Sequence, residues 1–315
     1  MPPIPVILVL GPTASGKTAL AVELAHRLGG EVISADAMAV YRGMDIGTAK
    51  PTAAERRGIP HHLIDAFDPA ERCDGQCWFD LADAALRNIH AGGHLPIVAG
   101  GTPLYAKLLV EGISSGAPRD AAVRAELQRR YREEGGAALH AELARIDPAY
   151  AAERHPNDER RIVRGLEVHA LTGRPYSSFH TTDGQRRADI APLCLGLHWE
   201  RPVLYARIDA RTRSMFTAGL VDEVRALRER MSPEARQAVG YKEVIAHLDG
   251  ACDLATALDK VAQKSRNLAK HQLTWYRGWP DIRWLPGDAP DLADQAEILV
   301  RAHLASVADS QAPTA

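Results

Sequence analysis

Residues 11–18 have the types and the spacing of a phosphate-binding loop. They read GPTASGKT, a match to G-x-x-x-x-G-K-T, and they stand between an apolar run and a helical pattern. The glycines let backbone N–H groups converge on an anion, and the amino end of the helix adds positive potential. Lys17 would reach the terminal phosphate oxygens, and the Thr18 hydroxyl would bind Mg²⁺. The sequence therefore predicts a di- or triphosphate site formed by Gly11, Pro12, Thr13, Ala14, Ser15, Gly16, Lys17 and Thr18.

A carboxylate follows the second apolar run. Asp36 closes the run 31–34 and is expected to point toward the phosphate loop. It could be a general base, a Mg²⁺ ligand, a ribose contact or a helix cap. Residues 41–51 come next, with glycines and the cations Arg42 and Lys50. That segment suits contact with a polyanion, or it is an ordinary solvated connection.

Gly100, Gly101 and Thr102 follow another buried run and open a helix. Two glycines let a ligand approach the backbone closely. The Thr102 hydroxyl could cap the helix, bind a substrate, or do both.

Two later segments carry cations at helical spacing. In 155–164, Arg160 and Arg164 are four residues apart and share a helix face. This face suits phosphates, or it is a solvated face paired with Glu159 and Glu167. In 264–277, cations interleave with aromatic residues, which favours phosphate contacts with base stacking. The alternative is a partly buried scaffold helix.

Strand and helix patterns alternate through the first third of the chain. We expect strands at 4–10, 31–34, 62–64 and 95–99, and helices at 17–28 and 78–90. Repeated strand–helix units indicate an α/β fold with a parallel, doubly wound sheet, whose ligands bind at the carboxyl ends of the strands. The phosphate loop, Asp36 and residues 100–102 would then lie on one edge.

The pattern changes after residue 116. Helices rich in arginine are expected at 121–132, 136–145 and 158–171, without strands, so residues 117–190 are predicted to form an all-helical insertion. A strand returns at 194–199, followed by helices at 203–230, 242–248 and 255–275, a strand at 282–285 and a terminal helix. The core domain would thus comprise 1–116 and 191–308, and 309–315 would be a disordered tail.

Charge, cysteine content and hydropathy exclude several classes of protein. The net charge of −2 over 315 residues excludes a grossly basic nucleic-acid binder but does not exclude a local basic surface. Four scattered cysteines do not suggest a disulfide framework or a zinc site. We find no signal peptide and no run of about 20 apolar residues, so we expect a cytoplasmic protein with no membrane contact.

The ordered set of motifs resembles the tRNA dimethylallyltransferase family, also called the IPP transferase family. The matches run from the phosphate loop to Trp284 and read GPTASGKT, SADAMAVYRGMDIGTAKP, GGTPLY, HPNDERRIVRGLEV, GLVDEVRAL, VGYKE and KSRNLAKHQLTWYRGW. The resemblance implies a P-loop NTPase-like sheet whose loop grips dimethylallyl diphosphate with Mg²⁺. The exocyclic N6 amine of adenosine 37, next to the anticodon, would attack the allylic carbon. The enzyme would be a monomer whose partner is the tRNA anticodon stem-loop.

The resemblance also implies roles for particular residues. Asp36 would be the general base, Thr102 a contact to the substrate base, and Lys17 and Arg211 would lie at the diphosphate. Contacts to tRNA would come from Asp36, Ala37, Met38, Ala39, Thr102, Arg124, Arg160, Arg161, Ile162, Val163, Arg164, Gln237, Gly240, Tyr241, Lys242, Lys270, His271, Gln272, Thr274, Trp275 and Arg277.

This chain departs from the family pattern at a few positions. Ala37 and Ala39 replace the usual Ser and Gln, so those side chains can make no hydrogen bond to the base. His271 replaces a usual Arg and is mostly neutral at pH 7. Two alternatives remain: an enzyme acting on small molecules, either an adenylate isopentenyltransferase or a kinase, and a nucleotide-regulated RNA-binding protein without activity.

Overall fold

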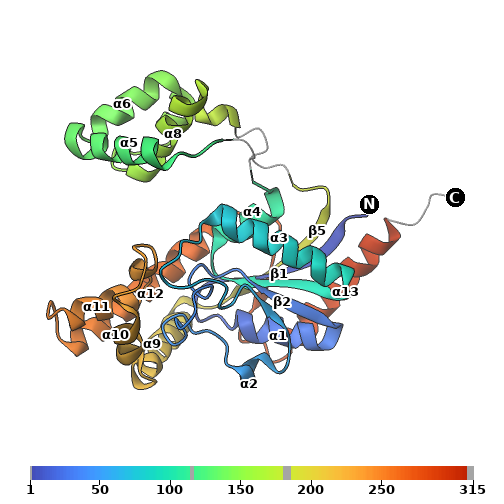
Figure 1. Ribbon diagram of the computed structural model, residues 1–315. Coiled ribbons are helices and arrows are strands. Elements are labelled where there is room, and N and C mark those ends of the chain that lie inside the picture. The colour runs from blue at the N-terminus through green and yellow to red at the C-terminus, as the bar shows by residue number, and fades with distance from the viewer. Residues whose placement is uncertain (1, 114–116, 180–185, 311–315) are drawn as a thin grey trace. The chain divides into compact units, whose positions relative to one another are not determined.

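The computed structural model describes residues 2–113, 117–179 and 186–310. Two compact units account for the chain (Figure 1). The core unit combines Met1–Val110 with Ala188–Ala315, and the helical unit is Glu111–Arg187.

The core unit contains a parallel sheet with the order β3-β2-β4-β1-β5-β6. Its strands are β1 (Ile4–Leu10), β2 (Gly30–Ser34), β3 (His61–His62), β4 (Leu95–Gly100), β5 (Ile190–His198) and β6 (Ile282–Pro286). All five neighbouring pairs are parallel. The predicted α/β fold class is therefore confirmed, and β1, which leads into the phosphate loop, lies between β4 and β5.

Both faces of the sheet are buried. Along β1, Val6, Leu8 and Leu10 belong to the apolar cluster that contains α3 (Gly75–Ala91) and α4 (Pro103–Glu111). Ile7 and Val9 belong to the cluster that contains α1 (Lys17–Leu28) and α13 (Leu292–Asp309). Helices cover the two faces, as Figure 1 shows for α1 and α3. Because successive side chains point to opposite faces, a strand covered on both sides reads as one continuous apolar run.

The core unit carries most of the helices. They are α1 (Lys17–Leu28), α2 (Ala53–Arg56), α3 (Gly75–Ala91), α4 (Pro103–Glu111), α9 (Arg201–Thr217), α10 (Leu220–Leu227), the 3₁₀ turn η2 (Ala235–Gln237), α11 (Tyr241–Leu248), α12 (Leu254–Arg277) and α13 (Leu292–Asp309). No helix within the described residues is long and apolar enough to cross a membrane.

The structure corrects several predicted boundaries. The helix expected at 203–230 is two helices, α9 and α10, because Gly219 adopts a left-handed conformation with φ of 102°. The short strand ends at His62 because Leu63 has φ of 61°. The strand that follows the helical unit, β5, begins earlier than the expected residue 194, at Ile190. The predicted tail began at 309, but α13 includes Asp309, and residues 311–315 lie outside the described part.

The helical unit contains α5 (Ala121–Glu134), α6 (Gly136–Ile146), α7 (Pro148–Ala152), α8 (Glu159–Thr172) and the 3₁₀ turn η1 (Tyr176–Phe179). Leu139, Leu143 and Ile162 are fully buried in its core. Glu167 is also fully buried, and it pairs with Arg124 and Arg164 at 2.7 Å each. A buried carboxylate needs such partners, so both arginines have a structural role here.

Candidate active site

The phosphate loop lies between the carboxyl end of β1 and the amino end of α1. Gly16 precedes the helix with φ of 91°, and no side chain caps the helix there. Ala14 has φ of 64°, a conformation that is unusual for a residue with a side chain. The amino end of α1 is thus left open to an anion, as the sequence predicted.

Side chains from α9 and α12 hold the loop at Thr13. The Oε1 atom of Gln272 accepts a hydrogen bond from the Thr13 backbone N–H at 2.8 Å, and Arg211 donates to the Thr13 hydroxyl. The Nε2 atom of Gln272 donates to the Gly101 carbonyl at 2.6 Å. Gln272 therefore connects the phosphate loop to the 100–102 segment, and the residue is only 7% exposed.

Two further side chains, Arg207 and Trp199, bind carbonyl groups of the phosphate loop. Arg207 donates from Nε to the Ala14 carbonyl at 2.9 Å, and Trp199 donates from Nε1 to the Ser15 carbonyl at 3.0 Å. The Arg207 guanidinium lies 4.1 Å from the centre of the Trp199 ring, a cation–π contact. These contacts fix the unusual backbone conformation at Ala14.

Lys17 is held inside the site. Its Nζ donates to the Pro12 carbonyl at 2.7 Å. Burial and the nearby charge of Arg211 lower the pKa of Lys17 to about 7, whereas Asp36 opposes the shift. The Oγ of Ser15 and the Nε of Arg211 are buried and have no hydrogen-bond partner among the described residues. Such unsatisfied groups fit a site built for an anion.

Asp36 lies near these cations: burial lowers the pKa values of both Lys17 and Arg211, and the charge of Asp36 partly opposes that shift. Its Oδ1 accepts hydrogen bonds from the backbone N–H groups of Met38 at 2.8 Å and Ala39 at 3.2 Å. Oδ2 accepts none from the described residues, so one oxygen orients the carboxylate and the other can act on a substrate. Asp36 therefore closes a turn with Oδ1, and it caps none of the helices described in the structure.

Thr102 lies beside this turn. Its Oγ1 accepts a hydrogen bond from the Ala37 N–H at 3.1 Å, and its own N–H donates to the Ala35 carbonyl at 3.1 Å. The hydroxyl hydrogen remains able to donate to a ligand. At Gly101, a Cβ would lie 2.6 Å from the Gln272 amide and 3.7 Å from the Lys17 ammonium, so glycine is required for this close packing.

A hollow of about 700 Å³ opens at the loop. We call it the phosphate-loop hollow, and its lining residues are Ala14, Ser15, Gly16, Lys17, Thr18, Ala19, Val22, Glu23, Ala49, Pro51, Glu55, Arg57, Arg207, Ala210 and Arg211. Four cations, two carboxylates and several small apolar side chains line it, and one of the carboxylates, Glu23, pairs with Arg57. This combination fits a diphosphate that carries a short hydrocarbon group.

Magnesium was predicted at Thr18, and the donor set fits it. Thr18 is exposed at the first turn of α1 and lines the phosphate-loop hollow. In the described ranges, no group of three or more His, Cys, Asp and Glu residues could hold a metal ion. Magnesium is commonly held by one or two protein groups together with substrate phosphates, so a single hydroxyl suits an ion shared with a diphosphate.

The residues predicted to contact tRNA differ in exposure. Exposed side chains in the core unit are Gln237, Lys242, Lys270, His271, Thr274, Trp275 and Arg277. Those on α12 share one face of that helix, opposite the buried Ala269, Gln272 and Tyr276, and Trp275 is 48% exposed. Buried members of the set are Ala39, Gly240, Tyr241 and Gln272, whereas Ala37 and Met38 are half-buried.

The helical unit shows the same contrast. Arg160 and Arg161 are exposed on α8, and Ile162 and Val163 are buried in the core of the unit. Arg164 donates to Glu167 and to the carbonyl groups of residues 117 and 118. Contact with RNA stays a prediction for all of these residues. Arg160 and Arg161 are exposed, and Arg161 also pairs with Asp158 at 2.9 Å.

Comparison with known proteins places this site in a family. The model of the IPP transferase family matches residues 39–279, and the isopentenyl transferase model matches residues 4–66. The chain is 46% identical to a tRNA dimethylallyltransferase of Anaeromyxobacter dehalogenans, with 92% of this chain and 98% of that protein covered. It is 48% identical to one of Halorhodospira halophila, with 90% and 94% covered.

The chain belongs to the IPP transferase family.

Two solved structures agree with this assignment. A tRNA isopentenylpyrophosphate transferase of Bacillus halodurans superposes with a TM-score of 0.73 at 40% identity, covering 98% of this chain and 99% of that one. A eukaryotic dimethylallyltransferase acting on tRNA superposes with a TM-score of 0.81 at 28% identity, covering 96% and 80%. The resemblance inferred from the motifs is confirmed, and the chain is an enzyme of this prenyltransferase family.

Sequence reasoning missed several residues that build this IPP transferase site. Arg207 stands four residues before the predicted Arg211, and Trp199 ends the expected strand 194–199, but neither was assigned a role in the site. Gln272 was grouped with the RNA contacts, but its buried amide holds the phosphate loop. Each of these contacts joins residues more than 170 positions apart, so local sequence patterns carry no signal for them.

Proposed function

We propose that this chain transfers the dimethylallyl group of dimethylallyl diphosphate to the exocyclic N6 amine of adenosine 37, beside the anticodon of tRNA. One observation supports this most directly. A phosphate loop with Lys17 and Arg211 lies at the same edge of the sheet as a carboxylate, Asp36, that has one uncommitted oxygen. This arrangement can bind a diphosphate leaving group on one side and accept a proton on the other.

The chemistry is a displacement at carbon. The N6 atom forms a bond to the allylic carbon, and the bond from that carbon to the diphosphate oxygen breaks with its electron pair. Lys17, Arg211 and the N–H groups of the loop stabilise the negative charge that develops on the leaving diphosphate. The Oδ2 atom of Asp36 takes the proton from N6, and Thr102 holds the turn in which Asp36 lies.

Magnesium, held by Thr18 and the diphosphate, would add positive charge at the leaving group. The adenine must leave its stack to reach this edge of the sheet, as other enzymes that modify bases require. The exposed cations and Trp275 on α12 suit phosphate contacts and base stacking on the anticodon stem-loop. We expect the enzyme to work as a cytoplasmic monomer.

The test is a direct assay. The protein is incubated with Mg²⁺, dimethylallyl diphosphate and unmodified tRNA. The tRNA is then digested to nucleosides, whose masses are measured. We expect an adenosine heavier by one dimethylallyl group, placed at position 37 by fragment mapping. Parallel reactions contain AMP in place of tRNA, or ATP in place of the prenyl donor. Prenylated AMP without modified tRNA, or phosphate transfer from ATP, would replace the proposal with one of the small-molecule alternatives.

Donor binding should depend on pH because the pKa of Lys17 is about 7 in the free protein. Above this pH the Lys17 amine of the free enzyme is neutral, whereas a bound diphosphate favours its charged, protonated form. Binding therefore takes up a proton, and the donor Kd should rise with pH, approaching tenfold per unit well above pH 7. Calorimetry in buffers of different ionisation enthalpy measures this uptake. The Lys17→Arg variant, whose side chain stays charged, should bind the prenyl donor without proton uptake. Equal uptake in both proteins would assign the proton to another group.

Arg160 and Arg161 should contribute to tRNA affinity through phosphate contacts. Both are exposed on α8. Their joint replacement by Ala should weaken binding about equally across tRNAs and flatten the log–log salt dependence of Kd by roughly 1 to 2. Donor KM should not change. The sequence favoured Arg160 with Arg164, but Arg164 holds the buried Glu167, and its loss would disturb folding.

The matched control removes the same charge elsewhere in the helical unit. Arg132 on α5 and Arg145 on α6 are also exposed and form no ion pair with the described residues, so Arg132→Ala with Arg145→Ala tests the effect of net charge alone. Equal salt slopes in the wild type and the Arg160 and Arg161 variant would mean that these two arginines are solvated surface. Equal flattening in both double variants would mean that only the total charge matters.

A further inference from the structure

Glu223, on α10, lies in a nest of backbone N–H groups. Its Oε2 accepts hydrogen bonds from Asp45 at 3.0 Å and Ile46 at 2.7 Å, and its Oε1 accepts one from Gly47 at 3.1 Å. Three successive N–H groups that converge in this way form an anion site, and here the anion is a side chain of the same protein. Hydrogen bonds to an ionised acceptor are among the stronger ones in proteins.

Tyr241 completes this arrangement from α11. Its hydroxyl donates to Oε1 of Glu223 at 2.5 Å. Burial, with the neighbouring Glu223 charge, raises the pKa of Tyr241, so the hydroxyl stays a donor. The ring packs directly on Gly47, where a Cβ would lie 2.4 Å from Cε2 of Tyr241. The segment 45–47 is therefore fixed both by hydrogen bonds and by close packing.

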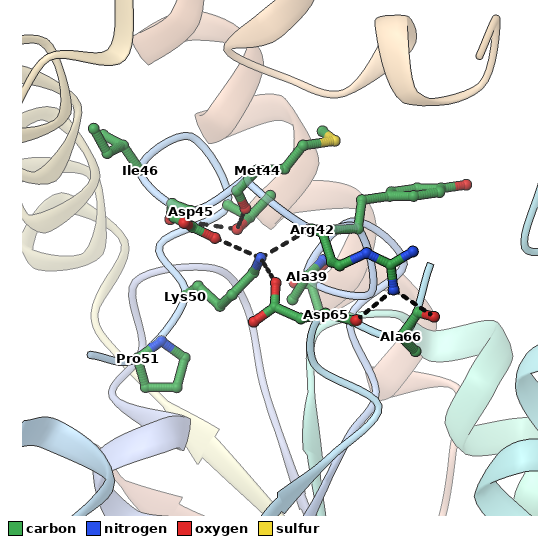
Figure 2. Close-up of polar contacts among 12 residues, drawn as sticks. Ala39, Arg42, Met44, Asp45, Ile46, Lys50, Pro51, Asp65 and Ala66 are labelled. Atoms are coloured by element: carbon green, nitrogen blue, oxygen red, sulfur yellow. Dashed lines mark hydrogen bonds and ion pairs between the residues drawn. The ribbon is translucent and has the colours of Figure 1, made fainter. Parts of the chain in front are cut away.

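A second anchor holds the other end of the same segment. The Lys50 ammonium donates to the Tyr41 carbonyl at 2.8 Å and to Asp45 and Asp65 at 2.6 Å each, and its side chain is 3% exposed. Figure 2 shows it between the two carboxylates. Of the two cations in 41–51, Lys50 thus cannot face a polyanion, contrary to one reading of the sequence.

Arg42, the other cation, is about half exposed and donates to the carbonyl groups of Asp65 and Ala66, also visible in Figure 2. Between the anchors, Ala49 has φ of 52°. This conformation costs on the order of 1 kcal/mol or more and persists only where surrounding contacts impose it. The 41–51 loop is therefore held in one conformation from both ends.

The anchored loop joins the two halves of the proposed site. It begins just after the turn that Asp36 closes, and its far end supplies Ala49 and Pro51 to the lining of the phosphate-loop hollow. Lys17 and Arg211 line the same hollow. A shift of the 41–51 loop would therefore move Ala49 and Pro51 relative to Lys17 and Arg211, which are proposed to bind the diphosphate.

We propose that Glu223 is a positioning residue for the prenyl donor, because it holds the 41–51 loop so that Ala49 and Pro51 form a fixed wall of the phosphate-loop hollow. The inference rests on the proposed function for the identity of the donor. Glu223 itself is not among the residues that line the phosphate-loop hollow. Its effect should therefore appear in donor binding more than in the chemical reaction.

The test compares Glu223→Gln with Asp222→Asn. Both remove one negative charge from α10, but Asp222 is an exposed neighbour that pairs only with Arg225 among the described residues. In Glu223→Gln an NH₂ group must face the N–H groups of the nest. We expect amide hydrogen exchange at 45–47 to become at least tenfold faster, and donor KM to rise about tenfold. The kcat value, tRNA Kd and Tm should change little, and Asp222→Asn should match the wild type.

Tyr241→Phe gives a milder variant in case Glu223→Gln folds poorly. It removes one hydrogen bond and keeps the ring on Gly47, so donor KM should rise two- to threefold. The double variant should be no worse than Glu223→Gln alone, because both changes act through one contact.

Three outcomes would overturn the inference. They are unchanged exchange at 45–47, faster exchange with unchanged donor affinity, and a parallel loss of Tm, kcat and tRNA binding that indicates general destabilisation. Donor affinity is also measured by calorimetry with dimethylallyl diphosphate and Mg²⁺, which needs no turnover. Failure of the proposed function would appear separately, as a wild-type protein that modifies no tRNA.

Discussion

Replacing Asp36 with Asn should lower kcat for prenyl transfer by about 10²-fold or more, while donor KM and tRNA Kd change little. The amide can still accept the hydrogen bonds from Met38 and Ala39, so the turn should persist. What is lost is the ionised oxygen that takes the proton from N6, and general base catalysis commonly contributes 10² to 10⁴-fold. Single-turnover rates with saturating tRNA measure the chemical reaction directly.

Asp36→Ala serves as the comparison, because it removes both the base and the turn contacts. If catalysis depends on the carboxylate, the two variants should lose similar activity, and only the Ala variant should also bind tRNA less well. Near-normal turnover in Asp36→Asn together with weaker tRNA binding would instead make Asp36 a binding or capping group.

The fold was predictable because its signals are local. The apolar run of β1 and the helix that starts at Lys17 were located to the residue, since a strand buried on both faces and a helix ended by Gly29 leave clear patterns. The break at Gly219 was missed. Glycine is tolerated within helices, and only the packing around it decides whether it adopts a left-handed conformation.

The site was predictable only in part. The phosphate loop, Asp36 and Thr102 follow strands, so their meeting at one edge follows from the parallel topology. The contacts that fix them come from remote elements: Gln272 on α12, Arg207 on α9 and Glu223 on α10. Nothing in their own neighbourhoods distinguishes these side chains from ordinary helix surface.

Charge was the least reliable guide. Lys50 and Arg164 were each compatible with contact to a polyanion, and both bind carboxylates and carbonyl groups of this chain. For Arg164 this includes Glu167, the partner that the sequence offered as the alternative. A cation and its acidic partners, such as Lys50 and Asp65, can be far enough apart in sequence that the pairing is not apparent. Exposure in the folded chain is therefore needed before a basic residue is assigned to RNA.

Replacing Lys17 with Ala should have the second largest effect. The ammonium is held at the Pro12 carbonyl and lines the phosphate-loop hollow with Arg211, and the nearby charge of Asp36 opposes the lowering of its pKa. Loss of one preorganised hydrogen-bond donor that faces a developing charge typically lowers kcat by 10² to 10³-fold, and we expect a loss of this order. Donor KM should rise as well, because the same amine binds the diphosphate in the ground state, whereas tRNA Kd should stay within about twofold.

Stability and nucleotide specificity provide the controls for Lys17→Ala. Burial lowers the pKa of Lys17, which means that the folded protein disfavours its charge, so Tm should not fall in the variant. ATP at millimolar concentration should support no reaction in either protein. Vigorous ATP hydrolysis by the wild type that disappears in Lys17→Ala would show that the loop binds a nucleotide for hydrolysis, and the transferase assignment of the loop would be wrong. An unchanged KM for the prenyl donor in the variant would instead mean that Arg211 and the backbone N–H groups bind the diphosphate without Lys17.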